Sequence, residues 1–444
     1  MTPADRGERL AEQTVDQSDL VPESRSPEYL RKLKVLLSVA TFFNGYDGFL
    51  LPFVLPLLLG SLGGSESQAG EIRAVVGVGA VLGFLLAAQA DRIGRRRLML
   101  VTIGGYTVAT LATAAAQSLL WLAVAQFFAQ VFLAGEWAVS MTIIVEEFHH
   151  RERGRALGAV TAMDTLGGIS VGVLAFLGLQ NTALSWRGFY LVGIIPLIVV
   201  AVMRRGLFES RRYERVADVE RRTHHLDMTK LTEPWRPEFR RNLLVVGLMH
   251  FFRYAATAAA VFWFSFYAQN EVGLSFSTTG LYIAAAGIVG AIGYVVGGRL
   301  MDRWGRRPAF LLYMAGSVVF GAWLFQIHSA GLMLPVLCLA IFFGLGATSI
   351  TSALSTEFFP TYVRSRAAAW CRNAFEIPGG IFGPLVVGLL GDHRTGPVGS
   401  IGDAMSLLFV VCLLPVAFVA LRYLGETRDV DLAAFDAEYE QVAT

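Results

Sequence analysis

The stretch Asp91-Arg92-Ile93-Gly94-Arg95-Arg96 returns later in the chain as Asp302-Arg303-Trp304-Gly305-Arg306-Arg307, at an offset of 211 residues (302 against 91). A second block keeps this offset and pairs the following residues: Glu146 with Glu357, and Arg153-x-Arg155-Ala156 with Arg364-x-Arg366-Ala367. Two separate motifs at one offset indicate a duplicated unit, since self-similarity at a fixed spacing marks an internal repeat. The chain is therefore expected to fold as two similar halves.

The composition is that of a membrane protein. Of the 444 residues, 54% are hydrophobic and only 16% are charged, whereas an average soluble domain carries about 25% charged residues. The mean hydropathy is +0.53. A transmembrane helix needs about 20 predominantly apolar residues, and twelve segments approach or exceed this length: 33–59, 72–90, 98–117, 119–145, 156–180, 186–203, 242–268, 276–298, 308–327, 330–356, 367–391 and 402–424.

Arginines alternate between the loops that join these segments. They gather before the first segment and in every second loop, whereas the loops 60–71, 269–277 and 328–330 have none, and that side carries only Arg187 and Arg394. Because Lys and Arg accumulate in cytoplasmic loops, both termini are expected in the cytoplasm of a cell whose cytoplasmic membrane the chain crosses repeatedly. The expected parts are a tail (1–32), a six-helix bundle (33–203), a cytoplasmic linker (204–241), a second six-helix bundle (242–424) and a tail (425–444).

Several classes of protein are disfavoured. The net charge of +2 gives no basic field for nucleic acid. The three cysteines lie in apolar runs without metal-ligand spacing. No Walker sequence occurs, and no nucleophile elbow stands out. We therefore expect no enzyme, no cofactor and no metal, but a monomer in the lipid bilayer with a small-molecule substrate and the proton as partners.

The second repeat, Gly298-Arg299-Leu300-Met301-Asp302-Arg303-Trp304-Gly305-Arg306-Arg307, resembles the loop signature G-x-x-x-D-R-x-G-R-R of the major facilitator superfamily. The first copy has Ala87 where the signature has glycine. The resemblance covers nearly the whole chain. It implies an all-α membrane protein with twelve transmembrane helices in two pseudo-symmetric six-helix bundles. Such repeats place a site at the midplane between them.

Two shorter stretches resemble particular groups within this superfamily. Gln130-Val131-Phe132-Leu133-Ala134-Gly135-Glu136-Trp137, followed by Glu146, is similar to the fourth helix of metabolite:proton symporters (Q-G-x-x-x-G-G-E-W), although Gln126 stands where that group has an arginine. Asn44-Gly45-Tyr46-Asp47 resembles the D-G-[FY]-D of aromatic-acid:proton symporters, with Asn44 replacing the first acid. The resemblance implies uptake of a small carboxylate or aromatic acid by proton symport with alternating access.

The loop motifs carry the expected cytoplasmic gate. An aspartate near a helix start can accept helix-end N–H groups and pair with arginine, and the resemblance implies that such links hold the cytoplasmic side closed. The alternative is that the arginines only set the topology. The gating candidates are Asp91, Arg92, Arg95, Arg96, Glu146, Arg153, Arg155, Asp302, Arg303, Arg306, Arg307, Glu357, Arg364 and Arg366.

Ionisable residues inside the segments are the candidates for transport, because a charge at the bilayer centre costs about 2.5–3.5 kcal/mol on insertion scales. At about 1.5 Å rise per residue, Asp47, Glu136 and Arg253 lie about 21, 13 and 16 Å from the cytoplasmic helix ends. Asp47 and Glu136 are the candidates for proton coupling, since a carboxyl that alternately meets water, solute and arginine can load and release a proton. A permanent ion pair of either acid with Arg253 is the structural alternative.

The candidate solute contacts begin with Arg253, whose planar guanidinium suits a carboxylate. Arg372 and Glu376 stand four residues apart and could pair along one helix. His250 could relay a proton or be a satisfied interfacial group. The full set of substrate-binding candidates is Arg253, Tyr46, Tyr254, Asn44, Asp164, Arg372 and Glu376.

Other functions remain open at this point. The same pattern suits a proton-driven exporter or an uncoupled facilitator of a sugar, an osmolyte or a drug-like solute. A membrane sensor that keeps the fold without transporting is the alternative from another class.

Overall fold

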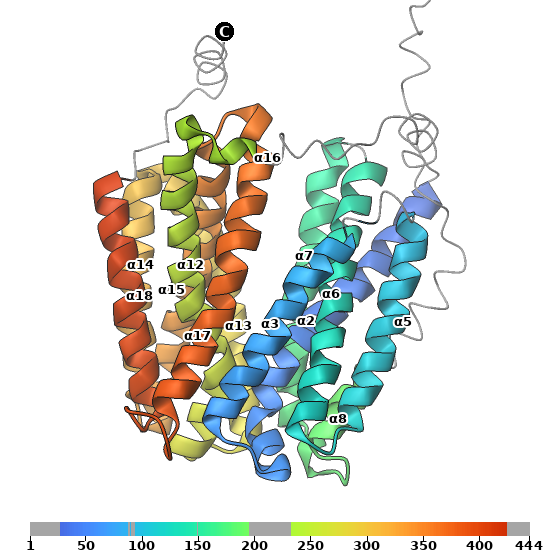
Figure 1. Cartoon of the computed structure of the whole chain (residues 1–444), viewed down its shortest axis with the longest axis vertical. Helices are drawn as coiled ribbons and strands as arrows, with labels where there is room; N and C mark the ends of the chain where they lie inside the picture. Colours follow the sequence, from blue (N-terminus) through green and yellow to red (C-terminus); the bar gives the residue numbers. More distant parts are fainter. Residues whose placement is uncertain (1–26, 88, 90–93, 149, 195–231, 424–444) are drawn as a thin grey trace, which may run out of the picture.

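The computed structural model describes residues 27–87, 89, 94–148, 150–194 and 232–423, and every element within them is a helix (Figure 1). Eleven of the described helices are long and apolar enough to cross a membrane. The sixth expected segment, 186–203, is described only as far as residue 194 and begins with a helix over Trp186–Val192.

The first half of the chain contributes one bundle. Its elements are α2 (Pro27–Leu62), α3 (Glu66–Ala87), α5 (Arg95–Ala114), α6 (Leu119–Glu147), α7 (His150–Phe176), the 3₁₀ turn η2 (Leu179–Asn181) and α8 (Trp186–Val192). Within this bundle α3 packs along α6, and α2 along α7.

The second half repeats these pairings, with α13 along α15 and α12 along α17. Its elements are η4 (Glu233–Trp235), α12 (Pro237–Phe266), the π-helical η5 (Tyr267–Glu271), α13 (Phe276–Trp304), α14 (Arg306–Leu324), α15 (Ala330–Glu357), α16 (Thr361–Trp370), the π-helical η6 (Cys371–Glu376), α17 (Ile377–Gly391) and α18 (Ile401–Tyr423). The eleventh expected segment is thus one helix that passes through a π-helical stretch.

The first and seventh helices start before the expected boundaries with the same sequence signal. The first helix begins at Pro27 instead of residue 33, and the seventh at Pro237 instead of residue 242. Each start has a proline followed by a glutamate, Glu28 or Glu238. Proline is preorganised for the first helical turn, and an acid there interacts favourably with the helix dipole. The helices therefore extend beyond the apolar residues from which their starts were predicted.

The two bundles meet away from the arginine-rich loops. We call the end where α2 begins and α18 ends the basic end, and the end with the α2–α3 and α17–α18 connections the opposite end. In Figure 1 the bundles separate toward the basic end and come together toward the opposite end. There α3 packs on α17 and α7 on α13, and the Ser265 hydroxyl donates to the Phe53 carbonyl over 2.8 Å.

The opposite end also joins the bundles through polar groups. The Ser67 N–H at the start of α3 donates to the Asp392 carboxylate after α17 over 3.1 Å. Although burial raises the pKa of Asp392, the N–H groups of Arg394, Ser67 and Thr395 hold it well below its usual range. This carboxylate is therefore an ionised acceptor at neutral pH.

Near the basic end, a cavity of about 310 Å³ lies against α2 and α7. It is lined by Lys34, Val35, Ser38, Val39, Phe42, Phe43 and Met163. The bundles thus pack on each other toward the opposite end, and the first bundle is hollowed near the basic end.

The crossing of α2 and α7 depends on a glycine. A Cβ added at Gly45 would lie 1.8 Å from the Asp164 carbonyl oxygen, whereas one at Gly48 would meet nothing within 4 Å. We expect Gly45→Ala to destabilise the protein, since overpacking costs about 1–3 kcal/mol. The apparent unfolding temperature of purified protein should fall for Gly45→Ala and stay unchanged for Gly48→Ala, the matched control on the same helix. Equal unfolding temperatures would contradict the close crossing.

Candidate functional site

An arginine of the second bundle reaches an aromatic ring of the first. The Arg372 guanidinium carbon, on η6, lies 4.2 Å from the centroid of the Trp137 ring on α6. Asp164 on α7 is half-buried and interacts electrostatically with Arg372. The structure therefore brings together two candidates, Arg372 and Asp164, with Trp137, which was recognised only as part of a motif.

A second arginine faces the other bundle in the reverse direction. Arg73 on α3 is half-buried and interacts electrostatically with Tyr254 on α12. Tyr254 packs over Gly380, where an added Cβ would lie 2.5 Å from its ring. Arg73 was not among the candidates from the sequence, although its position inside the segment 72–90 was the signal, because an ionisable residue within a span is a functional candidate. The substrate-binding role of Tyr254 stays a prediction.

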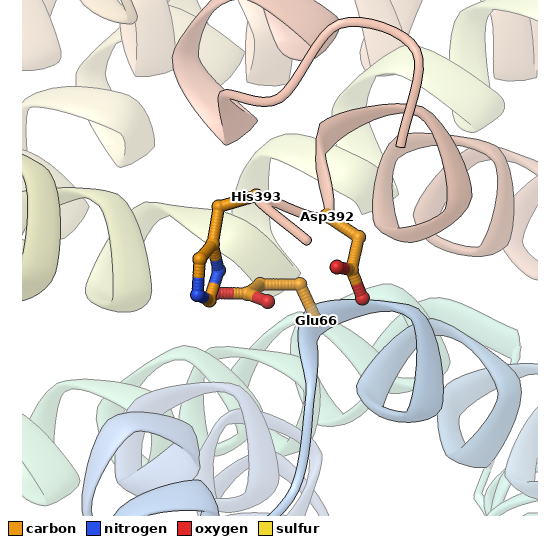
Figure 2. A group of neighbouring side chains, drawn as sticks. All are labelled: Glu66, Asp392 and His393. Carbon is orange, nitrogen blue, oxygen red and sulfur yellow. The ribbon is translucent and has the colours of Figure 1, made fainter. Parts of the chain in front are cut away.

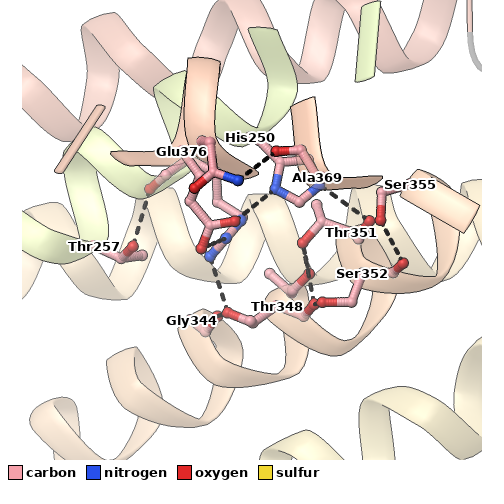
Figure 3. A network of polar contacts seen from close by, with 12 residues as sticks. His250, Thr257, Gly344, Thr348, Thr351, Ser352, Ser355, Ala369 and Glu376 are labelled. Carbon is pink, nitrogen blue, oxygen red and sulfur yellow. Dashed lines mark hydrogen bonds and ion pairs between the residues drawn. The ribbon is translucent and has the colours of Figure 1, made fainter. Parts of the chain in front are cut away.

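The second bundle contains a compact polar network (Figure 3). Glu376 on η6 accepts a hydrogen bond from His250 Nδ1 at 2.9 Å and lies 3.7 Å from the Arg253 guanidinium. His250 Nε2 lies 3.3 Å from the Thr351 carbonyl, and Arg253 donates to the Thr348 hydroxyl over 2.9 Å. These groups connect α12, α15 and η6.

The network places two of the candidate residues. Arg253 is 1% exposed and has Glu376 as its acidic partner, so it ties α12 to η6 in this conformation, and its solute contact stays a prediction. Glu376 makes its described hydrogen bond and ion pair with α12, and Arg372 interacts with it electrostatically. The π-helical η6 bonds i to i+5 and does not align residues four apart as an α-helix does. His250 is a satisfied group, bonded at both ring nitrogens.

Asp47 is buried in the first bundle among hydroxyl groups. It is 9% exposed and interacts with Tyr46, Tyr106 and Tyr190. Its Oδ1 has no hydrogen-bond partner among the described residues, and the ion pair with Arg253 considered above is not among the described salt bridges. Asp47 therefore has an oxygen free to hold a proton.

Three other candidates make contacts inside the first bundle. The Tyr46 hydroxyl donates to the Phe189 carbonyl over 2.7 Å and the residue is 1% exposed, so it is not open to a solute in this conformation. Asn44 donates to the Leu133 carbonyl over 3.4 Å. Glu136 is 6% exposed and accepts from Thr102 on α5 at 3.3 Å and from Ser140 at 2.9 Å. The coupling role of Glu136 stays a prediction.

The expected gate is described only for its second copy. Arg306 donates to both Glu357 oxygens, over 3.0 and 2.9 Å, and lies 3.5 Å from Asp302. The other described contacts stay in the same bundle: Arg307 to the Leu421 carbonyl, Arg364 to the Phe359 carbonyl, and Arg366 to Glu233. Arg303 is exposed.

The side chains of the first copy of the gate are not among those that the structure describes. Asp91 and Arg92 lie outside the described residues, as do the side chains of Arg95, Arg96, Glu146, Arg153 and Arg155. The gating role therefore stays a prediction for both copies.

The sequence profile of the Major Facilitator Superfamily matches residues 37–384. The chain belongs to this superfamily. Its members are transporters and not enzymes, so the prediction of a multi-pass membrane transporter of small organic solutes is confirmed.

Individual relatives of this superfamily resemble the chain over most of its length. The "Probable 4-methylmuconolactone transporter" of Cupriavidus pinatubonensis is 29% identical over 87% of this chain and 88% of its own. The "Gallate transporter" of Pseudomonas putida is 25% identical over 93% and 95%. A solved bacterial homologue of the lysosomal transporter Spinster shares the fold, with a TM-score of 0.74 and 16% identity over 89% of this chain and 97% of that chain. The resemblance to metabolite and aromatic-acid transporters is thereby confirmed.

The Glu376 network supports a stability prediction. Removing one partner of a buried ion pair costs about 3–5 kcal/mol, whereas replacing both partners by apolar residues costs far less. We expect Glu376→Leu to lower the apparent unfolding temperature strongly and the double variant Arg253→Leu/Glu376→Leu to recover most of the loss. Arg372→Leu, four residues away and exposed, is the control with a smaller effect. If the decreases in unfolding temperature of the two single variants simply added up in the double variant, the pairing of Arg253 with Glu376 would be refuted.

Proposed function

We propose that this protein takes up small aromatic or carboxylic acids across the cytoplasmic membrane by proton symport with alternating access. The observation that carries the proposal is the Arg372–Trp137 contact, which joins a cation and a large ring across the two bundles. The names of the relatives that transport gallate and 4-methylmuconolactone support the same solute class.

The chemistry of this contact suits an acid attached to an unsaturated ring. The guanidinium offers a planar fork of N–H donors to a carboxylate, and the indole offers a face for stacking at about 0.5–1.5 kcal/mol beyond buried area. The Asp164 carboxylate balances the positive charge of Arg372 while no solute is bound. An arriving carboxylate would replace this partner, so the site exchanges one anion for another.

Arg73 and Tyr254 would form the other wall. They repeat the arrangement of a cation from one bundle and a ring from the other. A solute held between both walls touches both bundles at once. Its binding free energy can then favour the conformation in which the walls are nearest, as differential affinity for two conformers requires.

The orientation follows from the arginines. We infer that the basic end faces the cytoplasm, because Lys and Arg accumulate in cytoplasmic loops. The described conformation would then be open toward the cytoplasm. The separation of the bundles toward the basic end (Figure 1) fits a cytoplasmic gate whose halves are apart. Alternating access would bring the basic ends together and open the opposite end.

Asp47 is the proposed proton carrier. Its free Oδ1 can take a proton, and the surrounding tyrosines can donate to the carboxylate or accept from the acid. Proton and solute would be linked through the common conformational equilibrium of the bundles, since Asp47 and Arg372 belong to different bundles.

The solute contact is tested with a charged and an uncharged form of one ring. Binding of gallate and of methyl gallate to purified protein is measured by calorimetry. We expect the parent to prefer gallate and Arg372→Gln to lose that preference by roughly tenfold, since a charge-assisted bond contributes about 1.5–3 kcal/mol. Trp137→Leu should weaken the binding of gallate and of methyl gallate to the same extent. Binding of a sugar or an osmolyte but no acid would favour the alternative solutes and overturn the proposal.

Proton coupling is tested separately from solute binding. In proteoliposomes, Asp47→Asn should retain exchange of labelled for unlabelled gallate but lose accumulation driven by a pH gradient, because only net uptake requires the proton. The matched control is Asp403→Asn, an exposed aspartate at the opposite end. Accumulation unchanged in Asp47→Asn would remove this residue from coupling. Gallate exchange in the parent without any response to the pH gradient would indicate an uncoupled facilitator.

A further inference from the structure

Three side chains at the opposite end converge from both bundles (Figure 2). Glu66 begins α3 of the first bundle, and Asp392 and His393 follow α17 of the second. One ligand atom from each lies within 4.8 Å of the other two. The pair Glu66–His393 is already in contact, with His393 Nδ1 2.8 Å from Glu66 Oε1.

Glu66 has an oxygen that no protein group uses. The residue is 8% exposed, and its Oε2 is buried without a hydrogen-bond partner among the described residues. A buried carboxylate oxygen without a partner costs free energy. A bound cation would remove this cost, so the atom itself points to a ligand.

The other two side chains suit the same ligand. Asp392 is 1% exposed, and its Oδ1 accepts from the N–H groups of Arg394 and Thr395 at 2.9 and 3.1 Å, which fixes the carboxylate in place. The His393 side chain is 58% exposed and is already held by its contact with Glu66. One imidazole nitrogen and two carboxylate oxygens are a ligand set that zinc prefers, with water as the fourth ligand.

We propose that Glu66, Asp392 and His393 form a binding site for a divalent transition metal of the zinc type, which ties the two bundles together at the opposite end. A tetrahedral site with bonds of about 2.0–2.2 Å sets its ligand atoms about 3.3 Å apart. Ligand atoms up to 4.8 Å apart therefore need to converge by up to about 1.5 Å, and the exposed histidine can supply part of this movement.

The site exists only while the opposite end is closed, because its ligands come from both bundles. Metal binding therefore stabilises the closed conformation and opposes its opening. That this end faces the exterior rests on the proposed orientation, and external zinc would then inhibit uptake. Binding and closure themselves do not depend on any solute or proton.

Binding is tested on the purified full-length chain with zinc chloride alone, by calorimetry. We expect one site in the parent, with affinity lowered at least roughly tenfold in His393→Ala and in Glu66→Gln, as loss of a ligand requires. His328→Ala is the control, because His328 is an exposed histidine outside the cluster. The proposal would be overturned if the parent bound no zinc, or if His328→Ala lost as much zinc affinity as His393→Ala. Because His393 is exposed, its variant is expected to fold normally, which the unfolding temperature without zinc verifies.

Closure is tested without transport. Spin labels at Ala183→Cys and Gly331→Cys, both exposed positions and one in each half of the chain, report the separation of the bundles at this end. In the parent, zinc should shift the distribution of distances between the two spin labels toward its shortest distances. In His393→Ala the distribution should stay unchanged. An unchanged distribution despite zinc binding would refute the tie between the bundles. A positive result here with no gallate binding would count against the proposed function alone.

Discussion

The close approach of the two bundles in the half away from the arginine-rich loops is the contact on which the described conformation depends. It is made by small residues: an added Cβ at Gly172 would lie 2.5 Å from the Gly280 carbonyl, and one at Gly70 would lie 3.1–3.2 Å from the backbone of Pro384 and Leu385. Backbones can pack this closely in a membrane only where side chains are small. Aromatic side chains also meet across this interface, since the Phe276 ring of α13 packs against the rings of Phe53 and Phe189 from the first bundle.

Buried charges divide into two kinds according to where their partners lie. Arg253 has its acidic partner inside the second bundle, and this compensation persists whichever way the bundles tilt. Arg372 and Arg73 meet residues of the other bundle, so their surroundings change when the bundles move. A charge with a fixed partner stabilises a fold, whereas one with a changeable partner can sense a solute. This distinction separates structural arginines from proposed binding ones better than depth in the membrane does.

The sequence predicted the fold well because three signals follow directly from the order of the residues. These are the length of the apolar segments, the alternation of arginines between the loops and the internal repeat. It predicted the site less well, because a span does not reveal which face of a helix turns toward which neighbour. Arg253 was placed first among the solute contacts and Arg372 was expected to pair with Glu376 for that reason, and the π-helical η6 breaks the spacing on which the second expectation was based. The Glu66–His393 contact joins residues separated by 327 positions. Loops with one acid and one histidine gave no local pattern that could predict it.

The repeat also shows where the two halves diverged. At the 211-residue offset, Asp47 corresponds to Ala258, and Arg253 corresponds to Phe42. The crossings are kept, since Gly167 packs on the Phe42 backbone of α2 much as Gly379 packs on the Phe251 backbone of α12. Duplication thus preserved the packing and divided the charges, leaving a carboxyl among tyrosines in one bundle and a compensated cation network in the other. The proposed solute groups come from both bundles, whereas the proposed proton carrier Asp47 belongs to the first alone. The relative position of the two bundles is then the variable through which each can affect the other.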